Sequence, residues 1–299
     1  MKLNIGYFAD GPWSHEAFKK IILDQEILIS FICVRYDTSD ITLKKFAQQY
    51  NIAYLKHENI NSEEFLFQIE KFNCDLFVSM SFNQIFKTKI INLPQFKIIN
   101  CHAGKLPFYR GRNILNWALI NDEKEFGITV HYVDEGIDTG DIILQKNYAI
   151  CDDDNYSTLL NKAYINCATT LYEALIMFKN GVVKGTKQTD IHPIGFYCTQ
   201  RKIGDEILDW HQTSREIFNF VRAICKPGPM ARAFINGHQI KINKVNLINQ
   251  APLYKCIVGA VLHKDKDGVL LVKTKDSFIQ IVDYEASINI KVGDRFEIN

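Results

Sequence analysis

Two side chains that could do chemistry stand together in INCHAGKLPFYRGRN, residues 99 to 113. Cys101 directly precedes His102, which would suit a thiol nucleophile with its general base. The residues before them are apolar and predict a buried strand, in which successive side chains point to opposite faces. Asn100 and His102 then share one face, while Cys101 points into the packing on the other. The sequence therefore predicts an amide and an imidazole that act together, with the cysteine as a buried apolar residue.

The loop after this strand carries groups that suit an anion. AGKLPFYRGRN contains two glycines, a proline, Arg110 and Arg112, and it ends where a helix is expected to begin. In open parallel sheets ligands bind beyond the carboxyl ends of the strands, and a helix N-terminus beside arginines suits phosphate. A connecting loop with solvent-facing arginines is the alternative for this segment.

A second polar loop, VDEGIDTGDI at residues 133 to 142, holds four acids and two glycines after an apolar strand. It is too acidic to bind phosphate, but one of its carboxylates could orient a histidine or relay protons. Spacing alone does not say which acid acts, and a solvated acidic turn is the alternative. His131, inside the preceding strand, is expected to be packed or solvent-facing rather than catalytic.

Other chemistries find little support in the sequence. Gly6 and Gly11 do not form the GxGxxG pattern of dinucleotide-binding proteins, and neither a Walker A nor a GxSxG motif occurs. The eight cysteines are scattered without a CxxC pair, so no zinc or redox site is indicated and no metal is expected. Trp13 and Ser14 follow the first strand, where they would either meet a ligand or begin a helix.

The elements that must position these loops alternate between strand and helix over residues 1–200. Apolar runs such as LNIGYFA, ILISFICVR and DLFVSMS are separated by helical stretches, among them NSEEFLFQIEKF with an Asn61–Glu64 capping box. Strands without polar alternation, separated by helices, predict an α/β domain with a Rossmann-like, doubly wound and mostly parallel sheet. We expect residues 1–200 to form the catalytic domain.

The pattern changes over residues 201–299. A helix with a Thr213–Glu216 capping box is stopped by KPGP, and short β-rich runs with Asn-Gly and Asp-Gly turns follow it. Short strands joined by tight turns predict a small OB-like β-barrel. We therefore expect a C-terminal domain that consists of a helix and a barrel.

Charge and hydropathy restrict the class of protein. The 299 residues carry 35 Lys and Arg against 34 Asp and Glu, which argues against a dedicated polyanion-binding protein. No apolar run reaches the length of a membrane span, and the start of the chain lacks the features of a signal peptide. A cytoplasmic protein without a membrane partner is expected.

The two polar loops together resemble a known family. NCHAGKLPFYRG followed by DEGIDTGDI is similar to the formyltransferases that use N10-formyltetrahydrofolate. Their signature is Asn-x-His, a loop ending Leu-Pro-x-x-x-Gly, and an Asp in a Gly-x-Asp-x-Gly turn. The second half of the chain resembles the C-terminal domains of methionyl-tRNA formyltransferase and of UDP-4-amino-4-deoxy-L-arabinose formyltransferase. The resemblance implies formyl transfer from N10-formyltetrahydrofolate to an amine, without a metal.

The resemblance also implies a role for each residue of the site. Asn100 would stabilise the oxyanion, His102 would be the general acid and base, and Asp138 would orient His102. The residues implied to line the pterin pocket are Gln84, Ile85, Phe86, Asp134, Glu135, Gly136 and Ile137. Those implied on the acceptor side are Trp13, Ser14, Lys105, Tyr109, Arg110 and Arg112. Relatives often have Gly-Ser-Leu-Leu-Pro where this chain has AGKLP, so Lys105 would change which acceptor is admitted.

The acceptor expected from the sequence is a nucleotide-linked amino sugar, often a dideoxy sugar, used for lipopolysaccharide or another surface glycan. Methionyl-tRNA is the alternative, and hydrolysis of formyltetrahydrofolate is a second one. Binding tRNA requires a basic surface, whereas residues 201–299 carry 15 Lys and Arg against 11 Asp and Glu. After the second strand, YDTSDITLKK also lacks the longer basic insertion of tRNA-formylating relatives. A nucleic-acid partner is therefore not expected, and the barrel would offer a surface for a homodimer.

Overall fold

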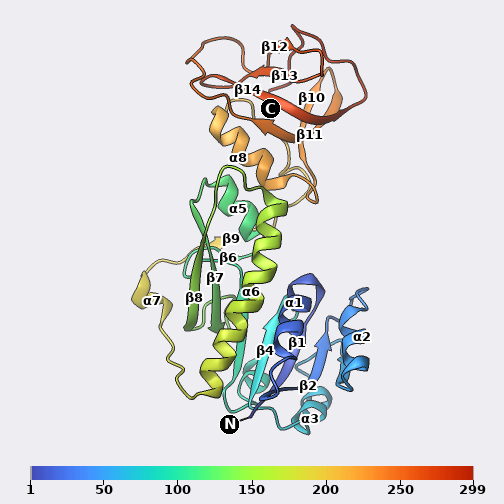
Figure 1. Ribbon diagram of the computed structural model, residues 1–299, viewed down its shortest axis with the longest axis vertical. Helices are drawn as coiled ribbons and strands as arrows, with labels where there is room; N and C mark the ends of the chain where they lie inside the picture. Colours follow the sequence, from blue (N-terminus) through green and yellow to red (C-terminus); the bar gives the residue numbers. More distant parts are fainter. Residues whose placement is uncertain (1, 299) are drawn as a thin grey trace. The chain divides into compact units, whose positions relative to one another are not determined.

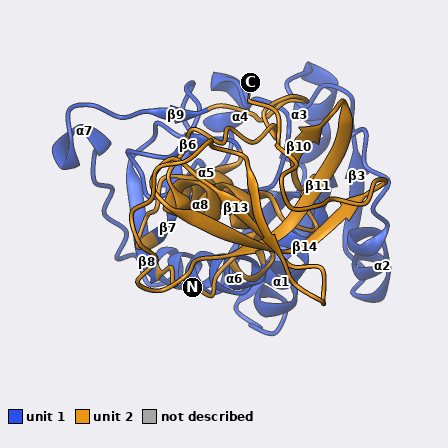
Figure 2. Ribbon diagram, turned by 90° about the horizontal axis from the view of Figure 1, so that it is seen from above, with its two compact units in different colours: residues 1–112, 126–148, 161–198 blue, residues 113–125, 149–160, 199–299 orange. Residues whose placement is uncertain are grey.

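The computed structural model describes residues 2–298 and divides the chain into two compact units. Both units are built from separate stretches of the chain, as the colours of Figure 2 show. Residues 1–112, 126–148 and 161–198 make up unit 1, and residues 113–125, 149–160 and 199–299 make up unit 2.

The frame of unit 1 is a seven-stranded sheet in the order β3-β2-β1-β4-β5-β7-β8 (Figure 1). The pairs β1–β2, β2–β3, β1–β4 and β4–β5 are parallel, whereas β7 runs antiparallel to β5. The predicted Rossmann-like, mostly parallel sheet is therefore confirmed. Its strands are β1 (Leu3–Ala9), β2 (Ile27–Val34), β3 (Ala53–Lys56), β4 (Leu76–Met80), β5 (Ile98–His102), β7 (Glu125–Tyr132) and β8 (Ile142–Ala149).

Helices cover both faces of this sheet, which explains why its central strands are apolar throughout. On one face, the ring of Phe8 lies 6.3 Å from that of Phe65 in α3 (Glu63–Glu70) and 5.2 Å from that of Phe86, just before α4 (Thr88–Ile91). Each such pair of rings adds about 0.5–1.5 kcal/mol beyond the area it buries. The other face packs against α6 (Tyr156–Lys179). The remaining helices of unit 1 are α1 (Gly11–Ile21), α2 (Thr42–Gln49) and α7 (Gln188–Ile191).

The start of α3 differs by one residue from the expectation. Ser62, not Asn61, is the capping residue, and its hydroxyl accepts a hydrogen bond from the Phe65 N–H. Asn61 instead turns toward the loop before α4, where its Nδ2 donates to the carbonyl oxygen of Ile85. Ser and Asn are both good caps, so the choice between neighbours was made by this tertiary contact.

Unit 2 combines two helices with a five-stranded sheet in the order β10-β11-β14-β13-β12. All four strand pairs are antiparallel. The predicted capping box at Thr213 and Glu216 is confirmed, and the helix that it opens packs against the other helix of the unit. The elements are α5 (Ile114–Ile120), α8 (Ser214–Ile224), β10 (Ala231–Ile235), β11 (His238–Asn246), β12 (Val261–Lys264), β13 (Leu270–Lys273) and β14 (Phe278–Ala286).

The predicted closed barrel is not what these strands form. The edge strands β10 and β12 are not hydrogen bonded to each other. The irregular segment near the end of the described chain touches both edges: the Val261 N–H donates to Asp294 O at 2.9 Å, and the Glu297 N–H donates to Phe234 O at 2.8 Å. Because β10 and β12 do not pair with each other, the five strands themselves do not close into a barrel.

Two short strands complete the part of unit 1 that surrounds the polar loops. β6 (Arg110–Gly111) pairs in parallel with β9 (Tyr197–Cys198). This pairing brings residues 197–198 back onto the loop that follows β5. None of the helices formed by residues 2–298 has the length and hydropathy needed to cross a bilayer.

Candidate active site

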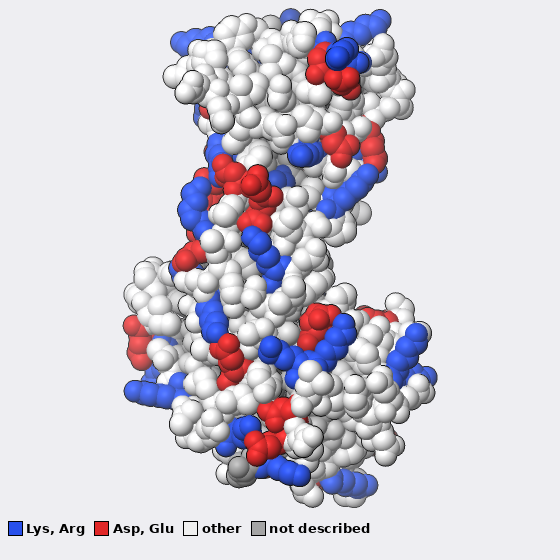
Figure 3. Space-filling view, viewed as in Figure 1, with Lys and Arg blue, Asp and Glu red and all other residues white. Residues whose placement is uncertain are grey.

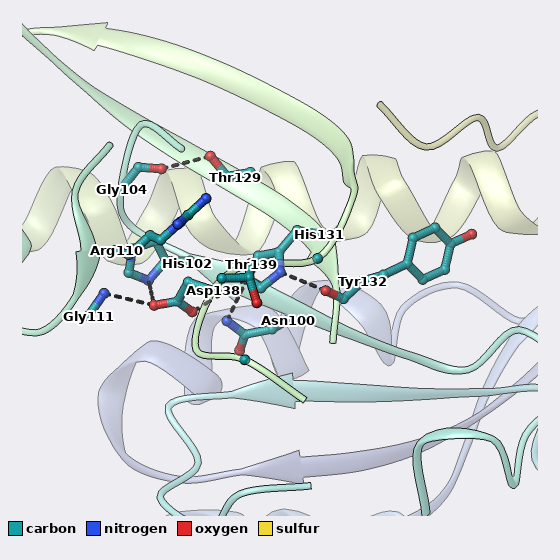
Figure 4. Close-up of polar contacts among 12 residues, drawn as sticks. Asn100, His102, Gly104, Arg110, Gly111, Thr129, His131, Tyr132, Asp138 and Thr139 are labelled. Carbon is teal, nitrogen blue, oxygen red and sulfur yellow. Dashed lines mark hydrogen bonds and ion pairs between the residues drawn. The ribbon is translucent and has the colours of Figure 1, made fainter. Parts of the chain in front are cut away.

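The end of β5 presents its side chains alternately, as the strand pattern predicts. The Sγ atom of Cys101 is buried and lies 3.6 Å from the carbonyl oxygen of Cys167 in α6. Asn100 and His102 reach His131 and Asp138 instead (Figure 4). A thiol that faces a helix on the opposite side of the sheet cannot give its proton to His102, so the geometry excludes the Cys–His pair.

The hydrogen bonds of His102 identify which of its ring nitrogens can exchange a proton. Nε2 lies 2.7 Å from the carbonyl oxygen of Tyr109. A carbonyl only accepts hydrogen bonds, so Nε2 carries a hydrogen and donates it. Nδ1 faces the carboxylate of Asp138, with 3.6 Å between Nδ1 and Oδ2. The lone pair of a neutral His102 is therefore on Nδ1, beside an acid that stabilises the protonated ring.

The tight turn that carries Asp138 explains why the GIDTG pattern has glycine at both ends, since a side chain at either position would clash. A Cβ atom on Gly136 would lie 2.0 Å from the Thr139 hydroxyl, and one on Gly140 would lie 1.8 Å from the carbonyl oxygen of Tyr132. The carboxylate of Asp134 holds the turn by accepting from the Gly136 N–H at 3.0 Å and from the Thr139 hydroxyl at 2.6 Å. Asp134 is thus a structural residue of the loop, and Asp138 is the acid that faces the histidine.

The surroundings of Asp138 keep it ionised. Burial alone would raise its pKa, but His102, His131 and a hydrogen bond from the Gly111 N–H together hold the pKa well below the usual value. The Gly111 nitrogen lies 2.9 Å from Oδ2, and Nε2 of His131 lies 3.5 Å from Oδ1. A carboxylate held by these partners stays charged at neutral pH and can stabilise a protonated imidazole beside it.

His131 is buried, which is one of the two expected positions for it, but its contacts with the site were not foreseen. The antiparallel register of β5 and β7 places His131 opposite Asn100. Its Nδ1 donates to the carbonyl oxygen of Tyr132 at 2.8 Å, and its Nε2 lies 3.2 Å from Nδ2 of Asn100. His131 is 2% exposed, so it does not meet a substrate. It orients Asn100 and Asp138 through its Nε2 instead. Its position seven residues before Asp138 was the signal in the sequence, but only the strand pairing gives it meaning.

Asn100 keeps a donor available for a reacting oxygen. Its amide has two N–H groups. One of them points to Nε2 of His131, 3.2 Å away, and donates to it when the ring is neutral. The second N–H is left to polarise a carbonyl oxygen and to hold the oxyanion that forms from it.

The residues predicted for the pterin pocket come from two loops that lie together. The Thr88 hydroxyl donates to the carboxylate of Glu135 and so joins them. Ile85 and Ile137, one on each loop, are 59% and 53% exposed and offer apolar surface to a flat heterocycle. Two other predicted residues have structural partners: Gln84 bonds His57 O and Ile60 N, and Phe86 is buried among the rings around Phe8.

The residues predicted for the acceptor side divide into buried and accessible ones. Ser14 is buried, and its hydroxyl donates to the carbonyl oxygen of Gly11 at 2.7 Å. Tyr109 is buried and contributes its carbonyl to His102. Trp13 is half-buried, edge-on to Tyr164 at 4.7 Å between ring centres. Among the cations, Arg112 is exposed, Lys105 is half-buried, and Arg110 donates to Gln188.

Within residues 2–298, no group of three or more His, Cys, Asp and Glu side chains is arranged to hold a metal ion. The cluster of Asn100, His102, His131 and Asp138 is instead an amide donor, a proton-exchanging imidazole and a charged carboxylate. Such a set suits acyl transfer to an amine, in which an oxyanion must be held and a proton must be moved.

Comparison with known proteins gives matches over both parts of the chain. A family profile described as formyl transferase matches residues 33–175, and one described as formyl transferase, C-terminal domain, matches residues 202–291. Among curated proteins, a methionyl-tRNA formyltransferase from Fusobacterium nucleatum is 34% identical over 239 residues, which cover 80% of this chain and 76% of the relative.

Two solved structures share the fold at lower sequence identity. The sugar 3N-formyltransferase WlaRD, determined with dTDP and 5-N-formyl-THF, is 22% identical, with a TM-score of 0.70 over 97% of this chain and 100% of that chain. An N-formyltransferase from Helicobacter canadensis, in complex with folinic acid and dTDP-3-aminofucose, is also 22% identical. Its TM-score is 0.70 over 95% of this chain and 100% of that chain. At this identity the likeness concerns the fold alone.

Proposed function

Since the chain belongs to the formyl transferase family, we propose that it transfers a formyl group to the amine of a nucleotide-linked amino sugar. The enzyme is a folate-dependent N-formyltransferase, and N10-formyltetrahydrofolate is its co-substrate. The pair of loops that carries Ile85 and Ile137 fits the pterin of that donor, because it combines exposed apolar side chains with the polar groups of the Asp134 turn.

The proposed chemistry uses three side chains. Asn100 donates its remaining N–H to the formyl oxygen, and this donor becomes stronger as negative charge develops on that oxygen. Nδ1 of His102 takes the proton that the attacking amine must lose, and Asp138 stabilises the ring while it is charged. The new bond joins the amine nitrogen to the formyl carbon, the bond from that carbon to N10 breaks, and His102 returns its proton to N10. His102 ends the cycle neutral.

The observation that supports a sugar acceptor is the connection between β2 and α2, residues 35–41. Its one cation, Arg35, donates to the carbonyl oxygen of Ser81 at 2.7 Å and lies 3.7 Å from the carboxylate of Asp10. Asp40 lies 3.0 Å from Nε2 of His15. A short connection whose cation is already paired offers little to the phosphates of a tRNA.

Surface charge supports the same acceptor class. On the face drawn in Figure 3, Lys and Arg side chains are interspersed with Asp and Glu rather than gathered into one basic area. Nucleic-acid-binding surfaces concentrate basic side chains along one stripe or patch. A nucleotide sugar carries a diphosphate and needs only a few cations, for which Arg112 and Lys105 stand beside the catalytic loop.

Methionyl-tRNA is the second candidate acceptor, and the identity to the Fusobacterium nucleatum protein favours it. That relative is closer in sequence than the two sugar-modifying structures, which share 22% of residues with this chain. The two candidates share the donor, the site and the chemistry. They differ in what must be bound beside Arg112, and therefore in the dependence of binding on salt.

An acceptor assay separates the candidates. The full-length protein is incubated with N10-formyltetrahydrofolate and, in turn, dTDP- and UDP-linked amino sugars, charged methionyl-tRNA, or no acceptor. Release of tetrahydrofolate and the mass of the product are measured, with the His102→Gln variant as the inactive control. Release that depends on an amino sugar supports the proposal. Release only with methionyl-tRNA replaces it by the second candidate, and equal release without acceptor identifies a hydrolase.

We also propose that residues 1–200 form the catalytic domain and that residues 201–299 offer a surface to a second copy of the chain. Residues 113–125 and 149–160 fall inside the proposed catalytic domain but cluster with residues 199–299. Sedimentation of the full-length protein tests the second copy, since a sedimentation coefficient of a monomer at all concentrations would contradict a homodimer.

A further inference from the structure

Gln188 is a buried side chain near the site whose carboxamide makes four hydrogen bonds, although no sequence motif marks it. It opens α7 and is 4% exposed. Its Oε1 accepts from Nε of Arg110 at 3.0 Å and from Nη2 at 2.6 Å. Its Nε2 donates to the carbonyl oxygens of Asp138 at 2.8 Å and Gly140 at 2.9 Å. Both N–H groups and both lone pairs of the carboxamide are therefore engaged.

These bonds join the two segments that hold His102. The Asp138–Gly140 segment supplies the carboxylate that faces Nδ1, and its backbone is what Gln188 binds. Arg110 is flanked by Tyr109, whose carbonyl accepts from Nε2 of His102, and by Gly111, whose N–H donates to Asp138. One carboxamide thus ties the acid and the ring of the catalytic pair to each other, from a position 50 residues beyond Asp138 in the sequence.

The segment that carries Gln188 is itself held tightly against Arg110. The Arg110 N–H donates to Phe196 O and the Arg112 N–H donates to Cys198 O, both at 3.2 Å. A Cβ atom on Gly195 would lie 2.7 Å from Cζ of Arg110, so only a glycine allows the two segments to approach this closely. The guanidinium also lies over the ring of Tyr197, 5.5 Å from its centre. Arg110 is therefore an anchor for this segment within the protein.

We propose that Gln188 is a positioning residue for formyl transfer, which holds the Asp138 turn at the distance from His102 that proton transfer requires. Gln188 touches no reacting atom and acts through the backbone of Asp138. This inference rests on the proposed catalytic roles of His102 and Asp138, but it is independent of which acceptor is used. A displacement of about 1 Å in a catalytic group can lower the rate about a hundredfold.

Two substitutions separate the two roles of the Gln188 carboxamide, which are to accept from Arg110 and to donate to the Asp138 turn. Gln188→Met keeps the length of the side chain and removes all of its hydrogen bonds. Gln188→Glu keeps an acceptor for Arg110 but has no donor for the carbonyl oxygens of Asp138 and Gly140, and its charge repels them. If holding the Asp138 turn is what matters, both variants should be impaired. If anchoring Arg110 is what matters, only Gln188→Met should be.

Asn4 provides a matched control at the opposite end of the sheet, where β1 begins. Its Nδ2 donates to two consecutive carbonyl oxygens, Phe72 O at 3.0 Å and Asn73 O at 3.1 Å, and its Oδ1 accepts from the Ser30 hydroxyl. Asn4→Asp therefore removes the same kind of double donor without approaching the site. A loss of rate that comes from general loosening of the protein would appear in this variant as well.

The test measures kcat, KM for the folate donor and the pH profile of kcat, on full-length protein whose folded fraction is checked by unfolding. The acceptor is the one that turns over in the assay described above. We expect kcat to fall tenfold to a hundredfold in both Gln188 variants, with KM changed less than about threefold. The pH profile of kcat should change as well, because Asp138 faces Nδ1 of His102 and would be displaced; His131 is the other titratable group that faces His102. Asn4→Asp should keep the wild-type kcat and profile.

Asp138→Asn separates the possible failures. If Asp138→Asn is inactive while folded Gln188→Glu has the wild-type kcat and pH profile, the positioning role is refuted and the catalytic assignment stands. If Asp138→Asn itself keeps the wild-type kcat, the catalytic assignment fails and the inference fails with it. A loss of kcat in Asn4→Asp equal to that in the Gln188 variants would also refute a specific role.

Discussion

Two carboxylates in this chain are held by several partners, and the partners differ in kind. Asp138 in unit 1 faces two histidines and the Gly111 N–H. Asp122 in unit 2 lies 2.5 Å from Nη2 of Arg215, which also lies 2.7 Å from Asp152. Both carboxylates are ionised at neutral pH, but only Asp138 stands beside imidazoles; Asp122 stands beside guanidinium and ammonium groups.

The pKa values of Asp138 and Asp122 are lowered in the same way, by neighbouring donors and charges that outweigh the effect of burial. For Asp122, burial alone would raise the pKa, and the hydrogen bonds from Arg215 and Lys124 lower it to about 2. A guanidinium stays protonated at every physiological pH, so the cluster in unit 2 never changes charge. An imidazole gains and loses a proton near neutrality, so the cluster in unit 1 can pass one on. A depressed carboxylate pKa therefore marks a proton-transfer site only when its partners can titrate.

Removing the imidazole should have the largest effect on activity. His102→Gln keeps a polar side chain of similar size but has no proton to exchange, so kcat/KM should fall about 10²–10⁴-fold. Steady-state kinetics with the preferred acceptor measure this, and circular dichroism verifies the fold. Wild-type kinetics in this variant would show that the Asp138 cluster, like the Asp122 cluster, takes no part in proton transfer.

Loss of the amide donor should come next. Asn100→Ala leaves the developing oxyanion without the second N–H of the amide, and kcat should fall about 10²–10³-fold. Because Asn100 is oriented by His131, the His131→Leu variant should show a smaller loss in the same assay. A greater loss in His131→Leu than in Asn100→Ala would make His131 a direct participant.

The cluster in unit 2 should respond in stability and not in kinetics. Asp122→Asn should lower the free energy of unfolding by about 1 kcal/mol at pH 7, since the pair is partly exposed to solvent. A folded-state pKa below the unfolded value of 3.8 stabilises the protein above that pH, and this contribution is lost as pH falls toward 2. Urea unfolding at pH 7 and at pH 3 should therefore give a larger difference from wild type at pH 7. The kcat of the variant should stay within twofold of wild type, and a tenfold loss would contradict a purely structural cluster.

The smallest effect is expected at the residue beside His102. Cys101→Ala should keep kcat within about twofold, because the thiol faces α6, and should cost roughly 1 kcal/mol of stability through lost packing. Inactivation of a folded Cys101→Ala variant would show that the thiol takes part in the reaction after all.

Much of the frame and part of the site were accessible from the sequence, because their signals lie within a few residues of each other. Apolar strands alternating with helices predicted the parallel sheet, and alternation within IINCH separated Cys101 from the site. The family resemblance implied a turn at GIDTG, and the structure gives the clashes that require its glycines. The Thr213–Glu216 capping box was equally local and is present.

What only the tertiary structure decided depends on segments that are far apart in the chain. The antiparallel register of β5 and β7 turned His131 from a packed strand residue into the partner of Asn100. Gln188 reaches the Asp138 turn across 50 residues, and no periodicity announces such a bond. The edge strands β10 and β12 of unit 2 are not paired with each other, and turn signals along the sequence cannot show which strands meet. Turns and alternation are set by neighbouring residues, whereas register, burial and proton-sharing partners are set by which distant surfaces pack together.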